Sequence, residues 1–257
     1  MVGNLLLRGM LAGVLAGLIC FCFLKAFGEP SVDRAIAFEA QMDDAKAKAS
    51  MPGMDMPAAA PDEELVSRPV QAGLGLFTGV VVYSAAFGGL FALVFALAYG
   101  RMGALEARSV SALLAGMGFI AVYVLPSLKY PANPPSVGEP ETIGMRTALY
   151  FAMIALSLAS MIGASMLHRR LLARLGAWDA AVVAGAAYLV VVTVVALLLP
   201  SVNEVPAQFP AVVLWQFRIA SLGAQLLMWT TIGLVFGRLA QQHLMAGTPR
   251  LGAAIRA

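Results

Sequence analysis

The chain has 257 residues, of which 60% are hydrophobic and only 12% are charged. Its mean hydropathy is +0.83, so it has too few polar groups to cover a soluble globule of this size, and an integral membrane protein is predicted. The formal net charge is only +3, and Cys20 and Cys22, both inside an apolar stretch and two positions apart on a helix, exclude a disulfide framework.

Six apolar segments are long enough to cross a bilayer as helices, because a helix needs roughly 20 residues to span about 30 Å of hydrocarbon. None of them shows the strict alternation of a membrane β-barrel strand. The sequence predicts an all-α integral membrane protein, one membrane domain over residues 1–257, with six transmembrane helices at about residues 5–27, 73–99, 110–128, 147–167, 178–199 and 211–236.

The first apolar segment carries Gly9, Gly13 and Gly17, which share one face of a helix. Small residues spaced in this way let a second backbone approach closely. Two interpretations are open: packing against another helix of the same chain, or docking of a separate membrane helix, including a second copy that would form a homo-oligomer. Lys25, at the end of the segment, disfavours cleavage as a signal peptide.

Residues 28–72 form a long, acidic stretch outside the membrane, which we expect to begin with a short interfacial helix. It contains Met51, Met54 and Met56, with Asp55 between them. Thioethers suit a soft cation such as Cu(I) and suit Co²⁺ poorly. Either these side chains collect a metal ion, or the stretch is a flexible linker without a ligand.

The distribution of charge predicts the orientation. If the amino terminus is cytoplasmic, the inner segments are rich in arginine and their acids are Glu106 and Asp179, whereas most other acids fall in the outer loops. The positive-inside rule then places both termini in the cytoplasm, in a multi-pass protein of the bacterial inner (plasma) membrane.

Polar side chains are concentrated in two predicted outer loops, around residues 129–146 and 200–210. A mouth rich in carboxylates attracts cations and offers them oxygen ligands; the alternative is that both loops are merely solvated. The candidate metal ligands are Met51, Met54, Asp55, Met56, Glu139, Glu141 and Glu204, and the candidate pathway or gate residues are Lys129, Tyr130, Asn133, Arg146, Asn203 and Arg218.

Arg218 lies inside the last predicted span, eight residues after Pro210. An arginine in lipid costs at least about 2.5 kcal/mol, so its side chain should face the bundle and have a partner. The nearest acids by topology are Glu139, Glu141 and Glu204. No catalytic motif accompanies them, so we expect neither an enzyme, nor a permanently bound cofactor, nor a nucleic-acid partner.

A tandem helix-loop-helix repeat is also predicted, because the third and fifth spans both end in Leu-Pro-Ser, at residues 125–127 and 199–201. Internal duplications of this kind are common in transporters. The alternative is chance similarity among leucine-rich helices.

Three stretches resemble the CbtA family of predicted cobalt transporter subunits: LLRGMLAGVLAGL with FGEPSVDRAIAFE, then LPSLKYPANPPSVGEPETIGMRT, then LPSVNEVPAQFPAVVLWQFRIASLGAQLLMW. The resemblance implies uptake of Co²⁺, to supply cobalamin synthesis, with a small single-span CbtB-like subunit that carries a histidine-rich metal motif. The family is usually described with five spans, and its members often have histidines where this chain has Met51, Met54 and Met56.

The sequence thus predicts the membrane subunit of a cobalt importer. The alternative is a non-transporting membrane scaffold or metal chaperone whose methionine-rich loop binds Cu⁺.

Overall fold

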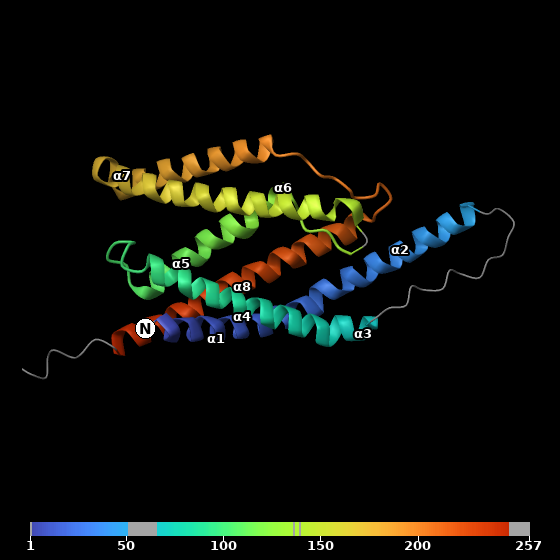
Figure 1. The fold of residues 1–257 in the computed structure, drawn as a ribbon, viewed down its shortest axis with the longest axis horizontal. Coiled ribbons are helices and arrows are strands. Elements are labelled where there is room, and N and C mark those ends of the chain that lie inside the picture. Colours follow the sequence, from blue (N-terminus) through green and yellow to red (C-terminus); the bar gives the residue numbers. More distant parts are fainter. Residues whose placement is uncertain (1, 51–65, 136, 139, 247–257) are drawn as a thin grey trace, which may run out of the picture. The chain divides into compact units, whose positions relative to one another are not determined.

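The computed structural model describes residues 2–50, 66–135, 137–138 and 140–246. Within these ranges every regular element is a helix (Figure 1). Five helices are long and apolar enough to cross a membrane: Val2–Lys46, Arg68–Ala98, Ala107–Lys129, Ile143–Leu198 and Ala211–Ala246. The predicted all-α class is confirmed, with five such helices where six spans are predicted.

The helices follow one another along the chain in this order. Helix α1 (Val2–Phe23) continues through a π-helical turn, Leu24–Gly28, into α2 (Glu29–Ser50). Helix α3 (Arg68–Val70) and the π-helical turn Gln71–Gly75 lead into α4 (Leu76–Ala98). Helix α5 (Ala107–Gly118), the π-helical turn Phe119–Val124 and α6 (Leu125–Lys129) form the next long segment, and the 3₁₀ turn Pro140–Thr142 precedes α7 (Ile143–Leu198) and α8 (Ala211–Ala246).

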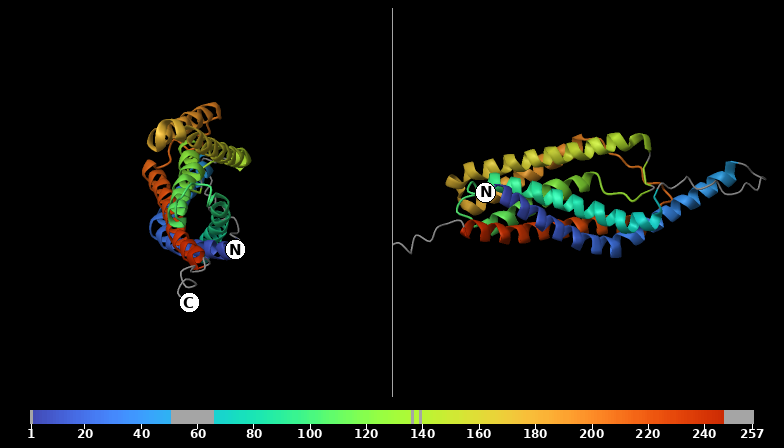
Figure 2. Two further views of the ribbon diagram at one scale, coloured as in Figure 1. Left: turned by 90° about the vertical axis from the view of Figure 1, so that its left-hand side faces the viewer. Right: turned by 60° about the horizontal axis from the view of Figure 1, so that its bottom comes forward.

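Helix α7 is 56 residues long and is interrupted at Gly176, whose φ of 77° and ψ of 173° are not helical. Only glycine adopts this conformation readily. The two limbs of α7 lie side by side (Figures 1 and 2), and the Ser157 and Tyr188 hydroxyls, one from each limb, are 2.9 Å apart. The predicted segments 147–167 and 178–199 therefore belong to one helical hairpin.

The chain divides into two compact units. The first comprises Met1–Phe23, Gln71–Met117 and Ala224–Ala257, and the second comprises Leu24–Val70 and Gly118–Gly223.

In the first unit, α1 lies alongside α4 (Figures 1 and 2). Gly9, Gly13 and Gly17 are all buried, and a Cβ at Gly17 would lie 2.8 Å from the Cα of Val81. A Cβ at Gly13 would lie 2.8 Å from the Cα of Ala85. Packing within the chain is confirmed as the use of this face. Helix α4 occupies this face in the structure, and the homo-oligomer stays a prediction.

The rest of the first unit is held by aromatic rings and by one close helix contact. Phe95 and Phe236 have ring centroids 5.0 Å apart, and Phe236 also packs edge-on against Phe91. The buried hydroxyl of Ser111 donates a 2.7 Å hydrogen bond to the carbonyl of Gly233. Helices α4 and α5 therefore both pack on the part of α8 that belongs to this unit.

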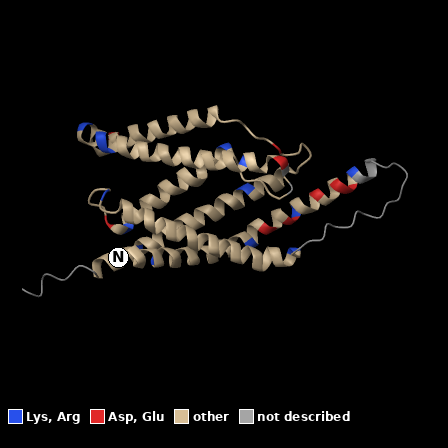
Figure 3. Ribbon diagram, in the orientation of Figure 1, with Lys and Arg blue, Asp and Glu red and all other residues tan. Residues whose placement is uncertain are grey.

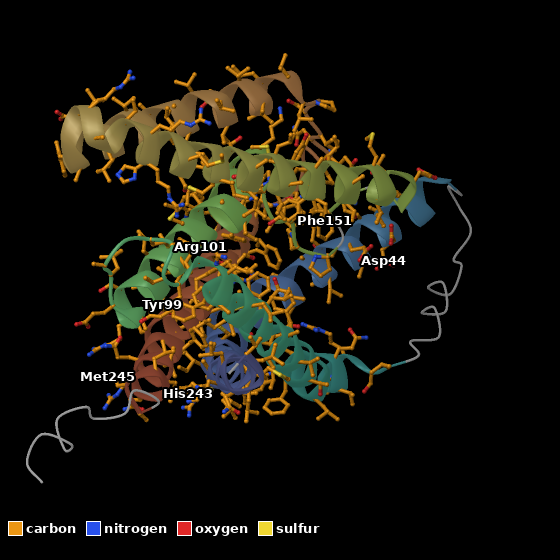
Figure 4. The ribbon with its side chains drawn as sticks, turned by 60° about the vertical axis from the view of Figure 1, so that its left-hand side comes forward. Asp44, Tyr99, Arg101, Phe151, His243 and Met245 are labelled. Atoms are coloured by element: carbon orange, nitrogen blue, oxygen red, sulfur yellow. The ribbon has the colours of Figure 1, made fainter. Side chains whose placement is uncertain are left out.

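Charged groups gather at the ends of helices. In the first unit, Arg101 after α4 and His243 near the end of α8 lie toward the same end (Figure 4). In the second unit, Arg169, Arg170 and Arg174 precede the turn of α7, and Asp179 follows it. The other acids of this unit lie along α2 and in the loops at the other end of α7 (Figure 3).

Helix α2 is longer than the short helix expected at the start of residues 28–72. Pro30 falls in its first turn, where a missing N–H costs nothing, and alanine-rich sequence with an Asp43–Lys46 pair at 3.6 Å favours continuation. The four predicted ligands Met51, Met54, Asp55 and Met56 lie outside the described residues.

Candidate functional site

The second unit contains a cavity of about 540 Å³ between its two polar loops and the adjoining ends of α7 and α8. Six of the predicted pathway and ligand residues line it: Tyr130, Asn133, Arg146, Asn203, Glu204 and Arg218. The other lining residues are Pro131, Pro134, Pro135, Val137, Ile143, Thr147, Tyr150, Val202 and Val205.

Two hydrogen bonds join the first loop, at residues 129 and 130, to the second loop, at residues 200 and 201. The Tyr130 hydroxyl donates a 2.8 Å hydrogen bond to the carbonyl of Pro200, and Lys129 Nζ donates to Ser201 Oγ at 3.1 Å. Burial raises the pKa of Tyr130 above its ordinary value, so the phenol stays protonated and remains a donor. Lys129 therefore holds the two loops together beside the cavity, but it is not one of the residues that line the cavity.

Arg218 connects α8 to the first loop. Its Nε donates to the carbonyl of Ala132 at 3.2 Å, and its Nη2 donates to Oδ1 of Asn133 at 3.0 Å. The expectation that Arg218 faces the protein and has partners is confirmed. Its partners among the described residues are neutral oxygens, whereas the acids Glu139, Glu141 and Glu204 were expected.

Glu204 pairs instead with Arg146. Arg146 Nε and Glu204 Oε2 are 3.2 Å apart, and the two side chains are only 26% and 12% exposed. This nitrogen is buried and its N–H makes no directed hydrogen bond to a described residue, so the pair is held mainly by charge. Because the pair is partly buried, water and salt weaken its electrostatic attraction less than they would at the surface.

Gly138 gives Arg146 room to lie against the first loop. Its φ is 119°, and a Cβ at this position would lie 2.6 Å from Cζ of Arg146. A residue without a side chain therefore allows the guanidinium to occupy the place that it needs to face Glu204.

Helix α2 supports one wall of the cavity. Ala35 of α2 is fully buried in a cluster with Val137, Phe209 and Val213, and Val205 packs on this cluster. The rings of Phe38 and Phe209 are 5.1 Å apart. Because Val137 and Val205 also line the cavity, the first turns of α2 are packed behind its wall.

A charged contact holds the beginning of α2 to the chain before α4. Arg68 Nη2 lies 2.6 Å from Glu29 Oε2 and 2.8 Å from Asp33 Oδ1. The sequence did not single out this contact, because nothing in the spacing of these residues indicates that Arg68 returns to α2.

The remaining predicted metal ligands are not part of the cavity lining. Glu141 is exposed in the 3₁₀ turn before α7, and Glu139 lies outside the described residues. Among the described residues there is no group of three or more His, Cys, Asp or Glu side chains arranged to hold a metal ion.

The lining that the sequence missed includes Ile143, Thr147 and Tyr150 at the start of α7. Ile143 and Thr147, like Arg146 and Tyr150, are four positions apart and share a helix face. The sequence could have indicated these residues if the helix had been predicted to begin before Arg146, because the helical period then places them on the faces that line the cavity.

One family matches most of the chain, from residue 2 to residue 241. No curated protein and no solved structure matches this chain. The matched family is described as a transporter subunit, which fits a multi-pass membrane protein without a catalytic motif and implies a partner subunit. The chain belongs to the CbtA family, described as probable cobalt transporter subunits.

Proposed function

We propose that this chain is the membrane subunit of a cobalt importer that works with a second membrane subunit. The match to the CbtA family over residues 2–241 is the observation that carries this proposal. The cavity in the second unit supports it, because ordered polar loops around a concave site at helix ends are the usual surroundings of a small ligand.

In this proposal, both termini are cytoplasmic and the cavity faces the outside of the inner membrane. Each limb of α7 is longer than the roughly 20 residues that a span requires, so the chain would cross the membrane six times. The partner would be a small single-span CbtB-like protein, and the cobalt would supply cobalamin synthesis.

The acids of α2 would draw cations toward the outer face. The methionines at 51, 54 and 56, with Asp55, are proposed as a capture segment, and Glu139, Glu141 and Glu204 as acids of the mouth. The Arg146–Glu204 pair, at 3.2 Å, and the contact of Arg218 with Asn133, at 3.0 Å, would keep the two loops in the arrangement that forms the cavity.

The test is accumulation of radiolabelled Co²⁺ in a bacterial host that lacks its own cobalt importers, with this chain expressed alone and then with the partner. We expect uptake above background. Glu204→Ala should reduce this uptake about tenfold, because Arg146 is then left without its partner in a partly buried pair. Asp179→Ala, which removes an exposed acid near the turn of α7 that does not line the cavity, is the matched control and should retain most of the uptake.

Absence of uptake in both arrangements, with the protein present in the membrane, would contradict the proposal. The copper-binding scaffold would then be favoured if the full chain binds Cu(I) and loses that binding when Met51, Met54 and Met56 are replaced by leucine.

A further inference from the structure

The charge of the cavity lining is opposite to what a bare metal cation needs. Arg146 and Arg218 line the cavity, and Glu204 is the one acid among its described lining residues. That acid is already paired with Arg146 at 3.2 Å. The charge of Arg218 remains, and a divalent cation placed in the same space would be repelled by it.

Donor groups are also in excess. A guanidinium has five N–H donors, and Arg218 uses Nε and Nη2 for Ala132 and Asn133. Its other N–H groups take no part in these two bonds. Unused donors of this kind, next to a net positive charge, are the chemistry that binds an anion.

The size of the cavity points to a small molecule rather than to a single ion. Its volume of about 540 Å³ falls inside the range of roughly 300–1,000 Å³ that is usual for small-molecule sites. Its walls combine prolines and valines with a few convergent polar groups, as such sites do.

We propose that this cavity binds a small organic polycarboxylate of about the size of citrate, with one carboxylate on Arg218. Arginine holds carboxylates through paired N–H groups, and Glu204 already places a carboxylate oxygen 3.2 Å from the guanidinium of Arg146. Resting on the proposed function, cobalt reaches this cavity as a carboxylate chelate rather than as the bare ion, with the carboxylate oxygens serving as its hard ligands.

The test is binding of radiolabelled citrate, without metal, to the purified full chain in nanodiscs of phosphatidylcholine, a lipid without net charge. We expect saturable binding that weakens by about tenfold or more in Arg218→Gln, since a charge-assisted hydrogen bond is lost. Arg238→Gln is the matched control, because Arg238 is an exposed arginine of the same helix that does not line the cavity.

A second variant separates loss of binding from loss of folding. Asn133→Asp keeps the acceptor for Arg218 Nη2 and adds a charge that compensates the guanidinium. We expect this variant to keep the thermal midpoint of the parent protein and still to lose citrate binding. Unchanged citrate binding in a folded Asn133→Asp protein would overturn the assignment.

Two further probes decide the ligand class. Binding of CoCl₂ without citrate that is lost in Arg218→Gln would overturn the proposal, and so would tighter binding of inorganic phosphate than of citrate. Cobalt uptake distinguishes this inference from the proposed function. Citrate binding without uptake contradicts only the transport proposal, whereas uptake of Co²⁺ by a protein that does not bind citrate contradicts only the carboxylate site.

Discussion

Arg146 shows how one side chain in the cavity depends on a residue that has no side chain. Gly138 has a φ of 119°, which is a region that other residues rarely adopt. A Cβ there would lie 2.6 Å from Cζ of Arg146. The backbone of the first loop and the guanidinium therefore fit together only because residue 138 is glycine, and the approach of Arg146 to Glu204 follows from that fit.

Gly138→Ala should destabilise the second unit and displace Arg146. The added methyl group introduces both backbone strain and a steric clash, which together cost about 1–3 kcal/mol. The measurement is the thermal unfolding midpoint of the purified protein in detergent, followed with and without the Glu204→Ala substitution. Because the methyl group acts through the Arg146–Glu204 pair, its effect should be smaller when Glu204 is already absent.

Gly144→Ala provides the comparison. Gly144 lies in α7 and a Cβ there meets no atom within 4 Å, so alanine should be neutral or slightly stabilising by its helix propensity. If Gly138→Ala and Gly144→Ala shift the midpoint alike, the close fit between Gly138 and Arg146 is wrong.

Much of the cavity could be predicted from residue types, but its pairings could not. Polar side chains between apolar spans indicated the loops, and five of these candidates line the cavity together with Arg218 of the last predicted span. The partner of Arg218 was sought among acids, because a backbone carbonyl such as that of Ala132 has no signature in a sequence. Likewise, nothing local decides whether Glu204 meets Arg146 of α7 or Arg218 of α8, since the sequence does not show which helix end lies beside the second loop.

At the scale of elements, the packing of α1 on α4 is the contact that the sequence indicated most directly. Glycines four positions apart allow two backbones to approach, and this matters more in lipid, where apolar burial gives helices little reason to associate. Gly13 faces Ser84 and Ala85, and Gly88 of α4 faces Gly9 and Gly13 in return. The small residues of the two helices therefore match each other.

Gly13→Ala should lower the stability of the first unit, although alanine is the better helix former by roughly 1 kcal/mol. A Cβ at Gly13 would lie 2.8 Å from the Cα of Ala85, and separating two packed backbones costs about 1–3 kcal/mol. In Gly79→Ala of α4, the added Cβ meets nothing within 4 Å. This variant therefore measures the stability gained from helix propensity without a steric clash. The thermal midpoint in detergent should fall for Gly13 and rise slightly for Gly79; a rise in both would contradict the close packing.

Element boundaries were predicted less well, for two physical reasons. The chain from Gly28 into α2 keeps a helical backbone although its composition changes from apolar to charged, and hydropathy reports the environment of a helix rather than its end. The turn of α7 consists essentially of Gly176, so it has none of the several loop residues that usually separate two helices. The tandem repeat stays a prediction.

At the scale of the whole molecule, the charge pattern and α7 together predict a topology. The arginines before Gly176 and the acids near both ends of α7 lie at opposite ends of this hairpin (Figure 3). Arginine-rich segments remain in the cytoplasm, so the turn should be inside and both ends of α7 outside. A single crossing by α7 would instead place its two ends on opposite sides.

Single cysteines in a Cys20→Ala, Cys22→Ala background distinguish these topologies. Glu141, Arg174 and Gln208 are exposed and lie before α7, near its turn and after it. With a membrane-impermeant maleimide on intact cells, Glu141→Cys and Gln208→Cys should both be labelled, and Arg174→Cys only after the cells are permeabilised, because each limb of α7 exceeds the roughly 20 residues of one span. Labelling of only one of the two end positions in intact cells would establish a single crossing and move the carboxyl terminus to the other side of the membrane. The background protein must keep its thermal midpoint, since Cys20 Sγ lies 3.3 Å from the carbonyl oxygen of Ala224.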